Sequence, residues 1–175
     1  WNYGRIFGWA DGLSEIFEPI YLQILWRSLM FAALTVLLTL ILCYPVAFWV
    51  SRLSDRWRLV FLFLITLPFF CSLIVRLYAW LLILKPTGLL NTTLLWAGLI
   101  SEPLEILYTP AAVVLGLVYV MISFMFLPLY AAVYNLDRAQ IEASLDLGAT
   151  RLQTFLQVGL PQTLPGIVGG AVIVF

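Results

Sequence analysis

The residues whose types and spacing are most informative lie in one polar segment toward the C-terminal end of the sequence. Asp137 and Thr150 are residue types that cap helix starts, and each is followed three positions later by a glutamine, Gln140 or Gln153, in the pattern of a capping box. Gly148 lies between the two patterns, and glycine readily adopts the left-handed backbone conformation that ends a helix. The segment is therefore predicted to form two short capped helices that turn around Gly148.

Catalytic and metal-binding chemistry have few residues to act through. The sequence contains no histidine, and its two cysteines, Cys43 and Cys71, lie apart within apolar runs. A free cysteine in such surroundings acts as a small hydrophobe, and neither a zinc site nor a Cys–His nucleophile can be assembled from this set. No Ser-His-Asp combination, carboxylate pair or glycine-rich phosphate loop is recognisable. We predict a non-enzymatic chain with no catalytic residue, no metal site and no cofactor of its own.

The composition indicates which kind of element must position this segment. Hydrophobic residues make up 63% of the chain and charged residues only 10%, whereas a typical soluble domain is about 25% charged and about 45–50% apolar. A water-exposed surface cannot be built from this inventory. The formal net charge of zero also provides no basic surface for nucleic acid. We predict an all-α polytopic membrane protein.

Three apolar runs are long enough for a membrane helix, which needs about 20 residues, and a fourth begins near Pro161 and reaches Phe175. Thr109 followed by Pro110 marks one helix start, because proline is favoured at the first helical position. The chain begins with Trp1 and stops at Phe175 within an apolar run, so we expect both ends to be cuts and the last span to be truncated. The predicted spans are residues 28–50, 59–84, 109–134 and 161–175.

The distribution of arginine predicts the orientation of these spans. The turn at residues 51–58 carries Arg52, Arg56 and Arg58 against one aspartate, whereas the regions 1–26 and 85–105 carry more acidic than basic residues. Basic loops remain on the cytoplasmic side, which places the turn inside and the other two regions outside. Helix parity then makes residues 137–160 cytoplasmic. In the outer loop we expect a short helix from Asn91 through Ile100, capped by Asn91 and lying flat on the membrane.

Arg76 is the one charged residue inside a predicted span. It lies 18 residues after Arg58, which is about 27 Å along a helix at about 1.5 Å per residue, close to the outer interface. Its guanidinium is expected either to reach the lipid headgroups or, together with Tyr78 and Trp80, to contact an outer gate or an external binding protein.

The polar segment resembles the EAA signature of ABC importer permeases. In that family the signature reads Glu-Ala-Ala, three residues, Gly, nine residues, Ile, any residue, Leu, Pro. Here Ser144 stands at the third position of the signature in place of alanine, and Val158 stands in place of isoleucine. Both changes are small. A plain helical hairpin between two spans is the competing interpretation. The matching residues, in order, are Glu142, Ala143, Ser144, Gly148, Val158, Leu160 and Pro161.

This resemblance implies a type I ABC importer permease fold over residues 1–175, with residues 137–160 as the cytoplasmic coupling loop. In the family this loop docks in a groove on a separate ATP-hydrolysing subunit. Glu142 would hydrogen-bond the partner, Ala143 would allow close approach, and Gly148 would leave room for the partner's surface. Leu160 and Pro161 would end the second short helix and begin the next span.

Further segments are similar to the spermidine/putrescine branch, among them Tyr44-Pro45, residues 73–80 and residues 88–91. Permeases for sulfate, molybdate, iron or phosphonate share several of these, and those substrates remain open. A secondary transporter or channel is a further alternative, although the first and third spans lack the ionisable residues that ion coupling uses. The resemblance implies a multi-pass inner-membrane subunit that contacts lipid and works with a second permease, two ATPase subunits that carry ATP and Mg²⁺, and a periplasmic substrate-binding protein.

Overall fold

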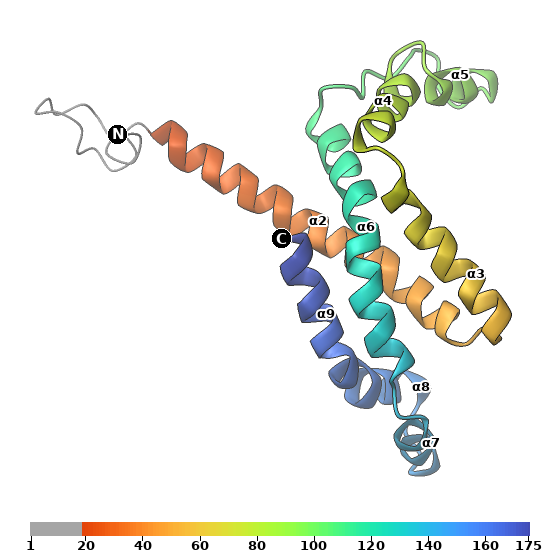
Figure 1. The fold of residues 1–175 in the computed structure, drawn as a ribbon. Helices are drawn as coiled ribbons and strands as arrows, with labels where there is room; N and C mark the ends of the chain where they lie inside the picture. The colour runs from red at the N-terminus through yellow and green to blue at the C-terminus, as the bar shows by residue number, and fades with distance from the viewer. Residues whose placement is uncertain (1–18) are drawn as a thin grey trace, which may run out of the picture.

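The structure is a computed structural model that describes residues 19–175, all of them in helices or the loops between helices (Figure 1). Within this range it confirms the predicted all-α class. The part of the outer flank formed by residues 1–18 lies outside the described residues. The elements are α2 (Pro19–Ser51), α3 (Asp55–Thr66), the 3-10 helix η1 (Leu67–Phe70), α4 (Leu73–Leu84), α5 (Leu89–Trp96), α6 (Pro110–Tyr134), α7 (Arg138–Asp146), α8 (Arg151–Thr154), the π-helix η2 (Phe155–Gly159) and α9 (Leu160–Val174).

Within residues 19–175, four stretches are long and apolar enough to cross a membrane, in agreement with the number of predicted spans, and the second of them comprises both α4 and α5. α2 covers residues 28–50 but begins earlier, at Pro19, because a charge such as Arg27 limits burial in lipid and does not interrupt a helix. α6 begins where predicted, with the Thr109 hydroxyl accepting a hydrogen bond from the Ala112 amide at 3.3 Å. The four stretches are Tyr21–Ser51, Leu73–Trp96, Pro110–Tyr134 and Arg151–Val174.

The predicted continuous span at residues 59–84 is wrong. α3 ends at Thr66, tightens into η1 and is separated by Cys71 and Ser72 from α4. Pro68 lies in the first turn of η1 and has no amide hydrogen to continue an α-helical ladder. The Ser123 hydroxyl of α6 donates to the Ile65 carbonyl at 3.2 Å and so satisfies a backbone group next to the break. α4 and α5 are likewise separate helices, with Lys85 to Gly88 between them.

The core lies where α2, α6 and α9 pack together, with α6 in contact with both other helices (Figure 1). Its buried apolar side chains come from the C-terminal half of α2, the C-terminal half of α6 and the end of α9. The N-terminal part of α2 extends away from the other helices in Figure 1, and residues 21–30 are all exposed. The core residues are Cys43, Ala47, Val50, Met125, Phe126, Leu129, Val133 and Val174.

Glycines allow α9 to approach α6 closely. A Cβ on Gly166 would collide with the Cβ of Ala132 and lie 2.8 Å from the Pro128 carbonyl oxygen. A Cβ on Gly170 would lie 2.6 Å from the sulfur of Met125, whereas a Cβ on Gly169 would meet nothing within 4 Å. Gly166 and Gly170 therefore allow the close approach of α9 to α6, whereas a side chain at Gly169 would have open space.

The end of the molecule away from α7 and α8 is formed by α4, α5 and the connection to α6 (Figure 1). The prediction that Asn91 caps a helix is wrong, because Gly88 precedes the first turn of α5 and Asn91 is fully buried inside the helix. Its amide nitrogen donates to the carbonyls of Leu104 at 2.9 Å and Lys85 at 3.3 Å, and its oxygen accepts from the Leu104 amide at 2.8 Å. Backbone groups of the irregular connection need partners, and this amide supplies them.

Candidate functional site

The first helix of the 137–160 segment, hereafter the inner loop, is capped as predicted but without the predicted capping box. The Asp137 carboxylate accepts from the Ala139 amide at 3.0 Å. Gln140 does not return to the Asp137 amide, which instead donates to the Gln162 side chain of α9 at 3.2 Å. The Gln162 amide nitrogen in turn donates to Gln140 at 2.8 Å. A residue on α9 therefore replaces the local partner and binds α7 to α9.

The turn between the two helices confirms the left-handed glycine. Gly148 has a φ angle of +87°, and a Cβ placed on it would meet no atom within 4 Å. The amide of Gly148 donates to the Leu145 carbonyl at 2.9 Å, and the amide of Ala149 donates to the Ser144 carbonyl at 3.2 Å. These bonds close the end of α7 and leave open space on the outer side of the turn.

The second helix starts with the predicted capping box. The Gln153 amide donates to the Thr150 hydroxyl oxygen at 3.3 Å, and the Thr150 amide donates to the Gln153 side chain at 2.9 Å. Two of the backbone donors at this helix start are therefore satisfied by two residues three positions apart.

Ser144, one of the two departures from the family signature, joins the two helices of the inner loop. Its hydroxyl lies 2.8 Å from the hydroxyl of Thr154, which is 4% exposed. An alanine at this position has no group that could form this bond. The departure therefore adds a hydrogen bond between α7 and the end of α8.

The remaining signature residues divide by exposure. Glu142 and Ala143 are exposed on α7, as is Gly148 at the turn, while Val158 and Leu160 are half-buried. The three exposed residues, together with the exposed Pro161 of α9, are the signature residues that a partner can reach.

Leu160 and Pro161 do not separate a loop helix from a span, contrary to expectation. The helix is continuous from Arg151 to Val174, with a π-helical turn at Phe155–Gly159. In a regular α-helix the ring of Pro161 would clash with the carbonyl four residues earlier. A π turn is wider and accommodates such a mismatch, so the proline is absorbed without ending the helix.

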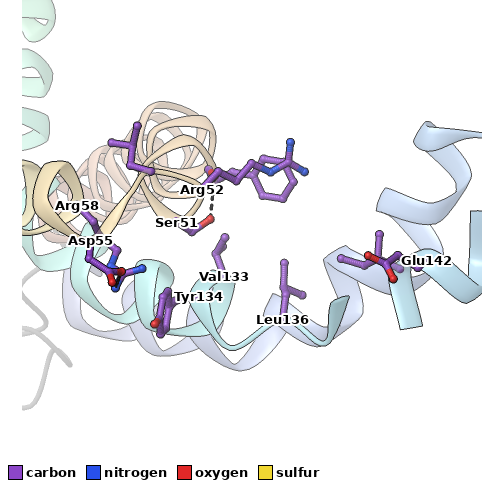
Figure 2. A pocket seen from close by; sticks show the side chains of 11 residues that line it. Ser51, Arg52, Asp55, Arg58, Val133, Tyr134, Leu136 and Glu142 are labelled. Carbon is purple, nitrogen blue, oxygen red and sulfur yellow. Dashed lines mark hydrogen bonds and ion pairs between the residues drawn. The ribbon is translucent and has the colours of Figure 1, made fainter. Parts of the chain in front are cut away.

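The inner loop shares a cavity with the arginine-rich turn after α2. Figure 2 shows this cavity, with Asp55, Arg58 and Tyr134 on one side and Glu142 on the other. Its volume is about 730 Å³. Arg58 forms an ion pair with Asp55 at 2.6 Å, and its guanidinium lies 4.8 Å from the centre of the Tyr134 ring. The turn and α7 therefore lie at the same end of the molecule, as the predicted topology requires.

The predicted outer contact residues lie on α4 and do not form one cluster. Arg76 and Trp80, one helical turn apart, are half-buried, and the Trp80 ring packs edge-on against Tyr119 of α6 with centroids 5.3 Å apart. Tyr78 is 63% exposed. The Arg76 Nε atom is buried and has no hydrogen-bond partner among the described residues.

One contact at the inner end was not predicted at all. The Tyr44 hydroxyl of α2 lies 3.0 Å from the Thr163 hydroxyl of α9, although the two residues are 119 positions apart. Gln162, next to Thr163, was missed for the same reason. Thr163 and Gln162 belong to no local sequence pattern, so only the packing of α9 against α2 and α7 reveals their contacts.

Comparisons with known proteins identify the family of this chain. The family model described as "Binding-protein-dependent transport system inner membrane component" matches residues 44–175. The spermidine/putrescine transport system permease protein PotB of Escherichia coli strain K12 is 40% identical over 164 residues, covering 94% of this chain and 60% of that protein.

Two further relatives show the range of the similarity. The inner membrane ABC transporter permease protein YdcU of Escherichia coli strain K12 is 33% identical, covering 93% of this chain and 56% of that protein. The probable molybdenum ABC transporter permease protein of Haloferax volcanii is 29% identical, covering 95% of this chain and 58% of that protein. The chain spans less than two thirds of the length of these curated relatives. It belongs to the family of inner-membrane components of binding-protein-dependent transport systems.

Proposed function

We propose that this chain is part of a permease subunit of an ABC importer and that its inner loop docks on a separate ATPase subunit. One observation carries this proposal: Glu142, Ala143 and Gly148 are all exposed on a helix pair joined by the Ser144–Thr154 hydroxyl pair, with open space at the Gly148 turn. A family member that works with a separate energy source needs such a surface. No catalytic role is assigned to this chain, and ATP with Mg²⁺ would be bound by the partner.

Polyamines are the proposed substrates. The 40% identity to the spermidine/putrescine permease PotB supports this assignment, whereas the molybdenum relative is 29% identical. The four described stretches that are long and apolar enough to cross a membrane contain no acidic residue that would bind a cationic solute. We therefore assign substrate selection to an external binding protein, and the partners would be that protein, a second permease and two ATPase subunits in a lipid bilayer. Sulfate, molybdate, iron or phosphonate is the alternative cargo.

Uptake in cells tests the class and the substrate together. Cells that lack the full-length permease should lose ATP-dependent uptake of labelled spermidine or putrescine and regain it when the gene is restored. Sulfate and molybdate uptake should be unchanged and serve as the matched measurement. Retained polyamine uptake with lost uptake of one of the other solutes would refute the polyamine assignment.

Arg76 and Trp80 of α4 are proposed to contact the outer partner or gate. The 63% exposure of Tyr78 on the same helix and the partial exposure of Arg76 support this, because a partner can reach both side chains. The substitution Arg76→Gln should weaken the stimulation of ATP hydrolysis by substrate-loaded binding protein and leave basal hydrolysis unchanged. Equal stimulation in the variant and the wild type would remove this role.

A further inference from the structure

We propose that Tyr44 is a positioning residue that carries movement of the inner loop to α2 through its hydrogen bond to Thr163. The inference rests on the proposed docking function of the loop and names the residues through which a movement there reaches the first spanning helix.

The hydrogen bond between Tyr44 and Thr163 has a defined direction. Thr163 is fully buried, and its hydroxyl lies 3.0 Å from the Leu160 carbonyl and 3.2 Å from the Gly159 carbonyl of its own helix. A threonine hydroxyl has one proton, which is directed to these carbonyls. The Tyr44 hydroxyl is therefore the donor and the Thr163 oxygen the acceptor, at 3.0 Å.

Tyr44 contacts both ends of the π-helical turn. Its ring packs edge-on against Phe155, the first residue of η2, with centroids 5.6 Å apart. Through Thr163 it is bonded to the turn that follows Gly159, the last residue of η2. A π turn is a single wide turn in an otherwise regular helix and is frequent at functional sites. Any change in its winding changes the relative position of the two groups that Tyr44 contacts.

The inner loop is connected to this turn by the hydroxyl pair of Ser144 and Thr154. Thr154 immediately precedes η2, and its hydroxyl lies 2.8 Å from that of Ser144 on α7. A contiguous series therefore runs from Ser144 through Thr154, the π turn and Thr163 to Tyr44. Contiguous networks of this kind can transmit displacement between elements.

Tyr44 is placed where α2 joins the core. Its neighbours Cys43 and Ala47 are buried against α6 and α9, whereas residues 21–30 are exposed. A displacement delivered at Tyr44 therefore acts on the packed half of α2. A hydrogen bond that only held α2 and α9 together would affect stability and abundance, and the two roles predict different measurements.

The test uses the full-length permease assembled with its ATPase, second permease and binding protein in liposomes. Tyr44→Phe keeps the ring against Phe155 and removes the hydroxyl. Solute taken up per ATP hydrolysed should fall about threefold to tenfold, the size of one lost hydrogen bond, with unchanged abundance and ATPase retention. Thr163→Val should have the same effect, Thr163→Ser should restore the wild-type ratio, and the double variant should be no worse than either single one.

Thr39→Val is the matched control. Thr39 is fully buried on α2, but its hydroxyl bonds only to carbonyls of its own helix, those of Thr35 at 2.7 Å and Val36 at 3.0 Å. This variant should keep the wild-type uptake per ATP. A wild-type ratio in Tyr44→Phe, additive effects in the double variant, or a loss explained wholly by reduced abundance would overturn the inference alone. A wild-type complex that retains no ATPase would overturn the proposed function as well.

Discussion

The two ends of the molecule are held together by different kinds of hydrogen bond. At the outer end one buried amide, Asn91, holds backbone groups of the α5–α6 connection, and the link from α4 to α6 includes the packing of Trp80 on Tyr119. At the inner end, side chains of different helices bond to one another, as in Ser144 with Thr154 and Gln140 with Gln162.

This difference predicts how far a disturbance at each end spreads through the molecule. The outer hairpin, residues 73–104, is held mainly by the bonds of Asn91 to nearby backbone and by one aromatic contact to α6, so a disturbance there is expected to remain local. The inner loop continues without a break into α9, which packs along α6. A disturbance there is expected to reach the spanning helices. The following predictions, ordered from the largest expected effect to the smallest, test that contrast.

Gly148→Asp should abolish uptake while leaving the permease in the membrane. The added side chain costs about 1 kcal/mol in a left-handed backbone and places a carboxylate where the ATPase is proposed to approach, which is unfavourable without a partner. Glu142→Lys should act in the same direction and more weakly. Uptake, membrane abundance and co-purification of the ATPase in detergent are the measurements.

Gly98→Asp is the matched variant at the outer end. Gly98 also has a positive φ angle, +68°, and open space at its Cβ position. The backbone strain is therefore similar, and the ATPase should remain bound with most of the uptake retained. Equal losses in the two glycine variants would mean that strain alone explains the effect.

Asn91→Ala should loosen the outer hairpin. It leaves the Leu104 amide and the Leu104 and Lys85 carbonyls without the side-chain partner that they have in the structure, and a buried unsatisfied group costs about 1–3 kcal/mol. Proteases added outside should cut the connection between α5 and α6 faster, while ATPase retention is unchanged. Asn91→Asp keeps the acceptor for the Leu104 amide but sets a buried carboxylate against the Leu104 and Lys85 carbonyls, so it should loosen the connection as well. Loss of the bound ATPase in Asn91→Ala would contradict the separation of the two ends.

Gly166→Ala should destabilise the core between the two ends. The new methyl group meets Ala132 and the Pro128 carbonyl, and overpacking of this kind costs about 1–3 kcal/mol. Gly169→Ala, on the same helix with nothing within 4 Å, is the control and should be near neutral. Thermal aggregation of the purified permease in detergent compares them, and a lower transition for Gly169→Ala than for Gly166→Ala would show that the helices pack differently.

Ser144→Ala should have the smallest effect. It restores the alanine of the family signature and removes one hydrogen bond to Thr154, worth about 1 kcal/mol. Uptake per ATP should fall modestly, within about fivefold. An effect as large as that of Gly148→Asp would mean that the hydroxyl pair, rather than the exposed surface, is the main element of the loop.

Local features of the inner loop could be predicted from the sequence, because they depend on residues a few positions apart. The Thr150–Gln153 box and the left-handed Gly148 are of this kind. The capping role given to Asn91 failed, since its partner Leu104 is 13 positions away in an irregular segment. At the start of α7, the Asp137 amide bonds to Gln162 of α9 instead of to Gln140, and this choice depends on how α9 packs.

Helix continuity was the harder prediction, because hydropathy reports apolar length and not backbone geometry. Pro68 interrupts a run that reads as one span, whereas Pro161 is absorbed by a π turn in a helix that was expected to end there. The same residue type has opposite consequences in the two places. The difference depends on neighbouring helices, such as Ser123 of α6 beside the break.

The most direct test of the central claim is the accessibility of a single cysteine on the exposed surface of α7. Ala143→Cys would be introduced into a full-length variant in which Cys43→Ala and Cys71→Ser remove the native thiols, with Ser101→Cys as the outer control. In inside-out membrane vesicles stripped of the ATPase, a membrane-impermeant thiol reagent should label Ala143→Cys and not Ser101→Cys. Adding back the ATPase should protect Ala143→Cys. Labelling of Ser101→Cys alone, or labelling of Ala143→Cys that the ATPase does not reduce, would contradict the proposal that this loop is the inner docking site.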